Sequence, residues 1–293
     1  MGGASEAREP RPWRRDRPPG GRRLIEPALT DDAFLRDVDG APAAALHLWW
    51  LGQSGFLVKL EDHYLLLDPY LSDSLTEKYE GTPTPHVRMT RRVVDPARLG
   101  FVDVVTSSHG HTDHLDPVTL QALRPRALVC PAGLRDLASE RAGVVPQAVD
   151  VDETVAVGGF RFTAVRADHD VPGGAVGFVV ECDRWTLYHS GDTAAYTGLG
   201  QRLRPFALDI ALLPINGQLG NMDGGEAARV AKEAGARLAI PCHYDMFEFN
   251  TAAPDDFVAT CGSLGQPCRV LRAGERLTIS AQAPAWGSPR RAV

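Results

Sequence analysis

The sequence of 293 residues has few cysteines, no excess of positive charge and no long apolar segment. No apolar run approaches the ~18–20 residues of a membrane-spanning helix, so we expect no membrane partner. The net charge of −6 gives no general attraction to nucleic acids. The five cysteines are odd in number and lack a Cys-x-x-Cys pair, which predicts reduced, mostly buried thiols in a cytoplasmic protein. These absences favour a globular protein with a small-molecule partner, and they leave a homo-oligomer open.

Composition divides the chain into three regions. Residues 1–43 are rich in arginine and proline and poor in apolar side chains, so we expect a flexible N-terminal tail that holds at most a short helix over 31–38. The tail lacks the apolar segment of a secretory signal. Residues 44–283 have the composition of one folded domain, and we expect residues 284–293 to be a C-terminal tail.

The main functional signal is a cluster of histidines and aspartates at residues 108–116, with the sequence Ser-His-Gly-His-Thr-Asp-His-Leu-Asp. His109 and His111 are two residues apart, so in an extended segment both imidazoles point the same way and can reach one metal ion. Asp116 and Pro117 then have the residue types of an N-cap and a first helical position. A solvated polar loop is the alternative, but the density of ligand-type side chains favours a metal site between a strand and a helix.

Apolar runs that precede polar residues recur along the chain. We expect five of these runs to be strands, at residues 101–106, 160–165, 185–188, 208–213 and 237–241. The polar residues that follow them are, in order, His109, His169, Asp192, Asn216 and His243. One such coincidence means little, but five indicate sheets whose ends converge on a single polar site.

The remaining segments complete an α/β pattern. An opening β-meander is expected from strands at 46–51, 56–60 and 64–69. Helices are expected at 117–123, 134–142 and 226–234, and a final pair of edge strands at 268–271 and 276–279. Residues 71–100 have no clear period, and we expect a long irregular connection of the kind that often covers a site. The alternation predicts two sheets flanked by helices.

Seven side chains at these positions form a candidate ligand set: His109, His111, Asp113, His114, His169, Asp192 and His243. We expect two divalent metal ions, one held by His109, His111 and His169 and the other by Asp113, His114 and His243. Asp192 would bridge them, because a carboxylate has two oxygens. Three imidazoles favour zinc, whereas the second centre would also accept manganese or iron. Asp168 and Asp170, which flank His169, are alternative ligands in its place.

The order of these motifs resembles that of the metallo-β-lactamase superfamily over roughly residues 46–250. The resemblance implies a four-layer αβ/βα sandwich of two mixed sheets flanked by helices. It also implies a hydrolase that uses a metal-bound hydroxide, with Asp113 relaying a proton. Asp68 resembles the early Asp that holds the ligand loop from behind. Diiron relatives carry Glu at the position of His111, which argues against redox diiron chemistry here.

Within the superfamily, the chain is most similar to the ascorbate-6-phosphate lactonase-like group, through residues 49–52, 188–192 and 240–247. This resemblance implies that the enzyme opens a lactone ring of the sugar-acid type. The segment at 170–174 is shorter than in that group, which argues against a phosphorylated sugar. Three side chains are candidates for substrate contact or for support of the ligands, with packing as the alternative for each: His189, Asn216 and Tyr244.

Phosphodiester hydrolysis and a non-catalytic role are the two alternatives to lactone hydrolysis. The early strands and the His-x-His-x-Asp-His-Leu-Asp stretch also resemble the N-acyl-phosphatidylethanolamine-type phospholipases D, which implies phosphodiester hydrolysis. The region from His243 to Asp245 fits the lactonase group better. A non-catalytic metal-bound scaffold is the third hypothesis, and the complete ligand set argues against it.

Overall fold

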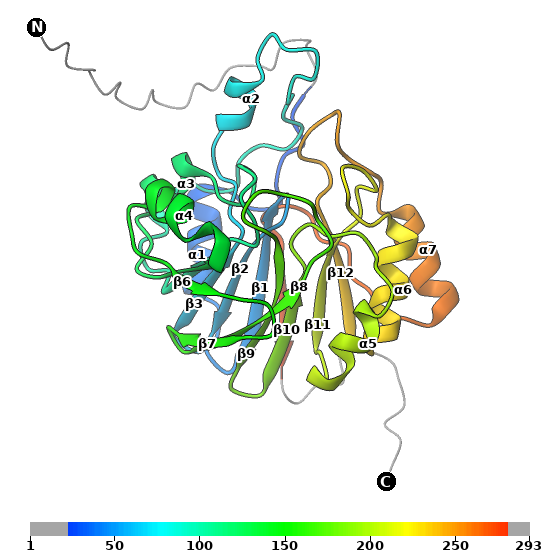
Figure 1. Cartoon of the computed structure of the whole chain (residues 1–293). Helices are drawn as coiled ribbons and strands as arrows, with labels where there is room; N and C mark the ends of the chain where they lie inside the picture. Colours follow the sequence, from blue (N-terminus) through cyan, green and yellow to red (C-terminus); the bar gives the residue numbers. More distant parts are fainter. Residues whose placement is uncertain (1–22, 281–293) are drawn as a thin grey trace, which may run out of the picture.

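Two β-sheets face each other in the computed structural model, which describes residues 23–280 (Figure 1). The first sheet has the strand order β13-β1-β2-β3-β4-β5-β6, and the second has the order β12-β11-β10-β9-β8-β7. Helices cover the outer faces, with α1, α3 and α4 beside the first sheet and α5, α6 and α7 beside the second. The α/β fold of two mixed sheets flanked by helices is therefore confirmed.

The strands of the first sheet are β1 (Ala45–Gly52), β2 (Gly55–Leu60), β3 (His63–Leu67), β4 (Val104–Thr106), β5 (Leu128–Pro131), β6 (Gln147–Val149) and β13 (Arg276–Ser280). Those of the second are β7 (Thr154–Val157), β8 (Phe160–Arg166), β9 (Val176–Cys182), β10 (Trp185–His189), β11 (Ile210–Pro214) and β12 (Leu238–Cys242). The α-helices are α1 (Asp31–Asp39), α2 (Ser74–Lys78), α3 (Pro117–Leu123), α4 (Arg135–Ala142), α5 (Leu199–Leu203), α6 (Gly224–Ala234) and α7 (Asp255–Leu264). Short 3-10 turns lie at Pro96–Arg98, Ala132–Leu134 and Arg204–Phe206.

Strand direction brings the candidate residues to one edge. The strands β1, β2 and β3 form the expected antiparallel meander. From β3 to β6 the neighbours are parallel, as they are from β10 to β12. Strand β8 runs in the same direction as β10, because both are antiparallel to β9. The side chains that follow β4, β8, β10 and β12 come together, so the carboxyl ends of these four strands meet at the same side of the molecule.

Several expected elements differ from the structure. Residues 268–271 and 276–279 do not pair as a hairpin: β13 pairs with β1 at the edge of the first sheet, whereas Cys268 forms an isolated bridge with Ala239 at the edge of the second. The strand expected at 101–106 is limited to β4. The two glycines before residue 226 lie inside α6, which begins after a capping box formed by Asp223 and Glu226.

The expected flexible tail to residue 43 differs from the structure in its second half. Residues 1–22 and 281–293 lie outside the described residues, but 23–43 pack on the domain. Phe34 and Val38, one helical turn apart on α1, are buried, and the Phe34 ring contacts Trp49 of β1 with centroids 6.3 Å apart. The short amphipathic helix thus covers a face of the first sheet that would otherwise be exposed.

Three further expectations concern membrane-spanning helices, the cysteines and the connection at 71–100. None of the described helices is long and apolar enough to cross a bilayer. All five cysteines are free thiols, and all but Cys268 are buried, as expected. The connection at 71–100 is mostly irregular and contains α2 and one 3-10 turn.

A buried lysine joins the first sheet to α1. Lys59 of β2 is 5% exposed, and its Nζ donates to the carbonyl oxygens of Val38 and Ala41, each at 2.9 Å. These carbonyls lie at the C-terminal end of α1, where helical backbone lacks its own donors and where a cation interacts favourably with the helix dipole. The contact therefore supplies a donor to Ala41 O and a second donor to Val38 O, which also accepts from Ala41 N at 3.3 Å.

We predict that Lys59→Met destabilises the protein by about 2 kcal/mol, because it removes two hydrogen bonds from a buried charged donor and leaves the Ala41 carbonyl oxygen without that donor. Urea denaturation would measure the change in the free energy of unfolding. The matched control is Lys232→Met, which changes an exposed lysine on α6 and should alter stability by less than about 0.5 kcal/mol. Equal stability of the two variants would show that Lys59 does not secure α1.

Candidate active site

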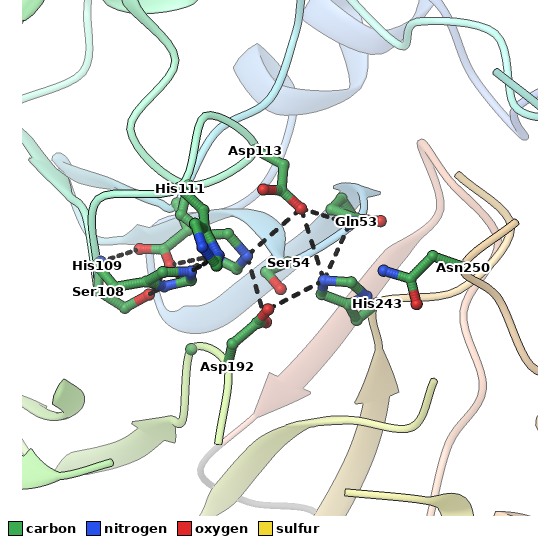
Figure 2. A network of polar contacts seen from close by, with 12 residues as sticks. Gln53, Ser54, Ser108, His109, His111, Asp113, Asp192, His243 and Asn250 are labelled. Carbon is green, nitrogen blue, oxygen red and sulfur yellow. Dashed lines mark hydrogen bonds and ion pairs between the residues drawn. The ribbon is translucent and has the colours of Figure 1, made fainter. Parts of the chain in front are cut away.

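The polar residues at the strand ends converge in two adjacent groups (Figure 2). The first contains the three histidines expected for one metal. The Nε2 atoms of His109 and His169 lie 3.0 and 3.4 Å from Nδ1 of His111. With Asp192, these residues bring four candidate ligand atoms within 4.8 Å of one another. The structure therefore brings the first predicted set together, although its residues come from the loops after β4, β8 and β10.

The second group contains Asp113, His114 and His243, whose candidate ligand atoms also lie within 4.8 Å of one another. Asp192 contacts this group as well: its Oδ1 lies 3.2 Å from His114 Nε2 and its Oδ2 lies 3.3 Å from His243 Nε2. Asp192 thus stands between the two groups, which is the position of the predicted bridge. Asp168 is not part of either group and instead forms an exposed ion pair with Arg166.

The donor set fits divalent metal ions. His114 Nε2 and Asp192 Oδ1 are buried and face each other at 3.2 Å, and neither forms a hydrogen bond with any other residue that the structure describes. A buried polar atom without a partner costs free energy, so the arrangement favours a group that both atoms can bind. Imidazole and carboxylate together are ligands that suit zinc and also manganese.

The electrostatics favour positive charge between the carboxylates. Burial lowers the pKa of His114, but the carboxylates of Asp192 and Asp113 outweigh it and raise that pKa well above its usual value. The same balance raises the pKa of His243 to about 9. In return, the two imidazoles outweigh the effect of burial on Asp113 and Asp192 and lower both carboxyl pKa values. A bound divalent cation would supply this positive charge in place of protons.

The first group has a different protonation balance. Burial is the largest cause that lowers the pKa of His109, His111 and His169, so these imidazoles are neutral at pH 7. The neutral imidazole is the form that binds a metal ion. The three histidines therefore present ring nitrogens that are ready to act as ligands.

Asp68 supports the ligand loop from behind, at the end of β3. Its buried carboxylate accepts hydrogen bonds from Ser108 N at 3.0 Å and from Ser108 Oγ, and it lies 2.7 Å from His114 Nδ1. The contact with Nδ1 leaves Nε2 of His114 to face the site. This arrangement matches the supporting role expected for Asp68.

The structure adds Gln53 to the site, although its sequence context predicts only a tight turn. Gln53, between β1 and β2, is fully buried, and its Nε2 donates to Asp113 Oδ2 at 2.8 Å and lies 3.0 Å from His243 Nε2 (Figure 2). Its backbone carbonyl also accepts from His243 N at 2.9 Å. The available signal was a glutamine in a two-residue connection between apolar strands.

Three residues of the site also have a strained backbone. Gln53, Asp68 and His243 have φ values of 51°, 37° and 62°, in the left-handed region that non-glycine residues seldom adopt. Such conformations persist only where the surrounding structure enforces them, and they cluster at functional sites. Each of the three has its side chain in or directly behind the two groups.

The remaining candidates lie away from the cavity. His189 Nε2 bonds to the Ser54 carbonyl at 2.9 Å, and the Tyr244 hydroxyl donates to the Leu271 carbonyl at 2.7 Å. Asn216 donates to Asn250 Oδ1 at 2.8 Å, so it lies behind a residue that lines the cavity. His189 and Tyr244 therefore pack within the protein and do not line the cavity. Asn216 can influence the cavity only through Asn250.

A cavity of about 480 Å³ opens over both groups. Its floor includes His111, Asp113, Asp192 and His243. The connection at 71–100 forms part of its wall, as expected for a loop that covers a site. The other walls contain aromatic side chains that sequence reasoning missed, because they lie on irregular segments with no periodic pattern: Tyr79, His86, Phe247 and Phe249.

Residues 63–244 match the family model of the beta-lactamase superfamily domain. A UPF0173 metal-dependent hydrolase of Opitutus terrae is 30% identical over 248 residues, which cover 80% of this chain and 100% of that protein. A possible metal-dependent hydrolase from Veillonella parvula has a TM-score of 0.68 at 16% identity, covering 80% of this chain and 100% of that chain. An isothiocyanate hydrolase from Delia radicum gut bacteria has a TM-score of 0.66 at 21% identity, covering 80% and 99%. At these identities the two solved structures show a shared fold alone.

We predict that His109→Ala lowers bound zinc or manganese and leaves the domain folded, because the histidine is replaced by a residue with no ligand atom. Metal analysis and circular dichroism of the purified variant would measure both. His63→Ala, which changes an exposed histidine of β3, is the control and should retain its metal. Full metal content in His109→Ala would contradict the ligand assignment.

A second prediction concerns Gln53. Gln53→Met keeps the side-chain length but removes the donor to Asp113, so we expect zinc affinity to fall by about tenfold. Competition with a chelator would measure it. Gln201→Met, on the exposed side of α5, is the matched control. If both variants bind zinc as the unchanged protein does, Gln53 only fills the turn.

Proposed function

Because the chain belongs to the metallo-β-lactamase superfamily and, within it, to the UPF0173 metal-dependent hydrolases, we propose that it is a dinuclear hydrolase that opens a lactone ring. The proposal of two metal ions is supported by the position of Asp192, whose carboxylate lies next to both groups of ligand-type side chains. One oxygen faces His114 and the other faces His243. A carboxylate in this position can serve two cations at once.

The proposed ligands are His109, His111 and His169 for one ion, and Asp113, His114 and His243 for the other, with Asp192 shared. Zinc and manganese are the proposed metals. When bound, two such ions lower the pKa of water and polarise the substrate carbonyl.

Asp113 is the proposed proton carrier. It lines the cavity, and Gln53 orients it through the hydrogen bond to Oδ2. In lactone hydrolysis the oxygen of water bonds to the carbonyl carbon, and the ring carbon–oxygen bond breaks. Asp113 would take a proton from the water and deliver it to the ring oxygen as that oxygen leaves, which gives a hydroxy acid.

The cationic side chains of the cavity favour a neutral ester over a phosphodiester. Of the two that line it, Lys78 is exposed at the rim. The other, Arg141, uses Nη1 to donate to the carbonyl oxygens of Gly110 and Leu115, at 2.9 and 3.0 Å. A phosphoryl group would typically meet arginines free to form paired hydrogen bonds. The cavity volume of about 480 Å³ suits a small molecule.

We expect protein purified without added metal to contain about two equivalents of zinc or manganese per chain and to hydrolyse a sugar lactone. Elemental analysis and parallel assays on a sugar lactone and on bis-p-nitrophenyl phosphate would test this. Removal of the metals by a chelator should abolish turnover, and re-addition should restore it.

Two outcomes would overturn parts of the proposal. Turnover of the phosphodiester alone would replace lactone hydrolysis by phosphodiester hydrolysis. Full turnover after complete metal removal would contradict the metal-dependent mechanism itself.

A further inference from the structure

One wall of the cavity is aromatic, and the proposed chemistry does not use it. The ring of Tyr79 stacks on His86 with centroids 4.0 Å apart and an interplanar angle of 16°. His86 also contacts Phe249 at 4.3 Å and Phe247 at 5.1 Å. All four rings line the same cavity that holds the candidate ligands. We call these four residues the aromatic wall.

Backbone contacts between two distant segments hold three rings of the aromatic wall in place, those of His86, Phe247 and Phe249. Met89 N donates to the Met246 carbonyl at 2.8 Å, and Glu248 N donates to the Val87 carbonyl at 3.1 Å. An isolated bridge pairs Arg88 with Phe247 between these hydrogen bonds. The two segments therefore form a short ribbon, and the rings on it are positioned before any ligand arrives.

A buried cation reinforces this ribbon from behind. The Arg88 side chain is 9% exposed, and its Nε lies 2.5 Å from Asp73 Oδ1. Its guanidinium also lies 5.2 Å from the Tyr70 ring centroid, and Tyr70 contacts Phe247 at 5.7 Å. Arg88 thus binds the protein's own groups. It supports the aromatic wall and is not available to an anionic ligand.

The surface presented to the cavity is apolar. Burial lowers the pKa of His86, so its ring is neutral and stacks as an aromatic plane. Phe249 is only half-buried, and Leu219, which also lines the cavity, is 68% exposed. Apolar surface of this kind at the mouth of a cavity marks a binding region for an apolar group.

We infer that the non-reacting part of the substrate is an apolar ring that stacks on the aromatic wall. The inference rests on the proposed function only in placing the reacting bond at the ligand groups of the same cavity. Hydroxyl groups of a sugar that lay against the rings of Phe247 and Phe249 would lose hydrogen bonds to water, because these rings offer none in return. An aryl substituent would gain ring contacts there instead.

Three lactones with the same five-membered ring test the inference: γ-phenyl-γ-butyrolactone, γ-butyrolactone and gulono-γ-lactone. We expect kcat/KM for the phenyl compound to exceed that for each of the others by about tenfold or more. In Phe249→Ala the ratio between the phenyl and unsubstituted compounds should fall by about tenfold, mainly through KM. Val258→Ala, an exposed apolar residue on α7, is the control and should keep the ratio.

A binding measurement separates this inference from the proposed function. Calorimetry on metal-depleted protein should show phenylbutanoate binding at least about tenfold more tightly than butanoate, and Phe249→Ala should remove the difference. If no lactone is hydrolysed but this difference is found, the lactonase proposal fails and the apolar site stands. If lactones are hydrolysed with the sugar lactone preferred, or with equal ratios in Phe249→Ala and the unchanged protein, the apolar site is wrong.

Discussion

The buried carboxylate of Asp68 joins the end of β3 to the loop after β4, and the candidate metal centre depends on that joint. A carboxylate with no exposed surface is costly unless donors surround it. The loop therefore folds so that Ser108 and His114 reach it. This one requirement orients the ring of His114 and turns its Nε2 towards Asp192. The ligands His169, Asp192 and His243 follow other strands, and they lie beside His114, whose position depends on Asp68.

The ends of the parallel strands could be predicted because their signals are local. An apolar run followed by a ligand-type side chain marks each of β4, β8, β10 and β12, and the chain order of these motifs indicates the superfamily. The metal identity and the substrate are not encoded in such runs. The assignment of seven ligands is a prediction that the geometry supports by bringing them into two adjacent groups.

Pairing between distant segments was harder to predict. Residues 268–279 have the alternation of two strands, but whether they pair with each other or with β1 and Ala239 depends on the edges that the rest of the fold leaves open. Gln53 has no spacing signal, since its partner Asp113 is 60 residues away. Residues 23–43 could not be assigned to the domain from composition, because composition describes an average, whereas two buried side chains, Phe34 and Val38, attach α1.

The aromatic wall and the metal ligands belong to different parts of the architecture. The ligands follow strands whose packing supports the whole domain, whereas three of the four rings of the aromatic wall lie on or next to a ribbon of two irregular segments held mainly by backbone hydrogen bonds. Side chains on such a ribbon can change without disturbing the sheets. In evolution, a chain of this design could therefore acquire new substrates by drift in two loops while its reaction chemistry stays the same. Laboratory selection could follow the same route by randomising the ribbon alone.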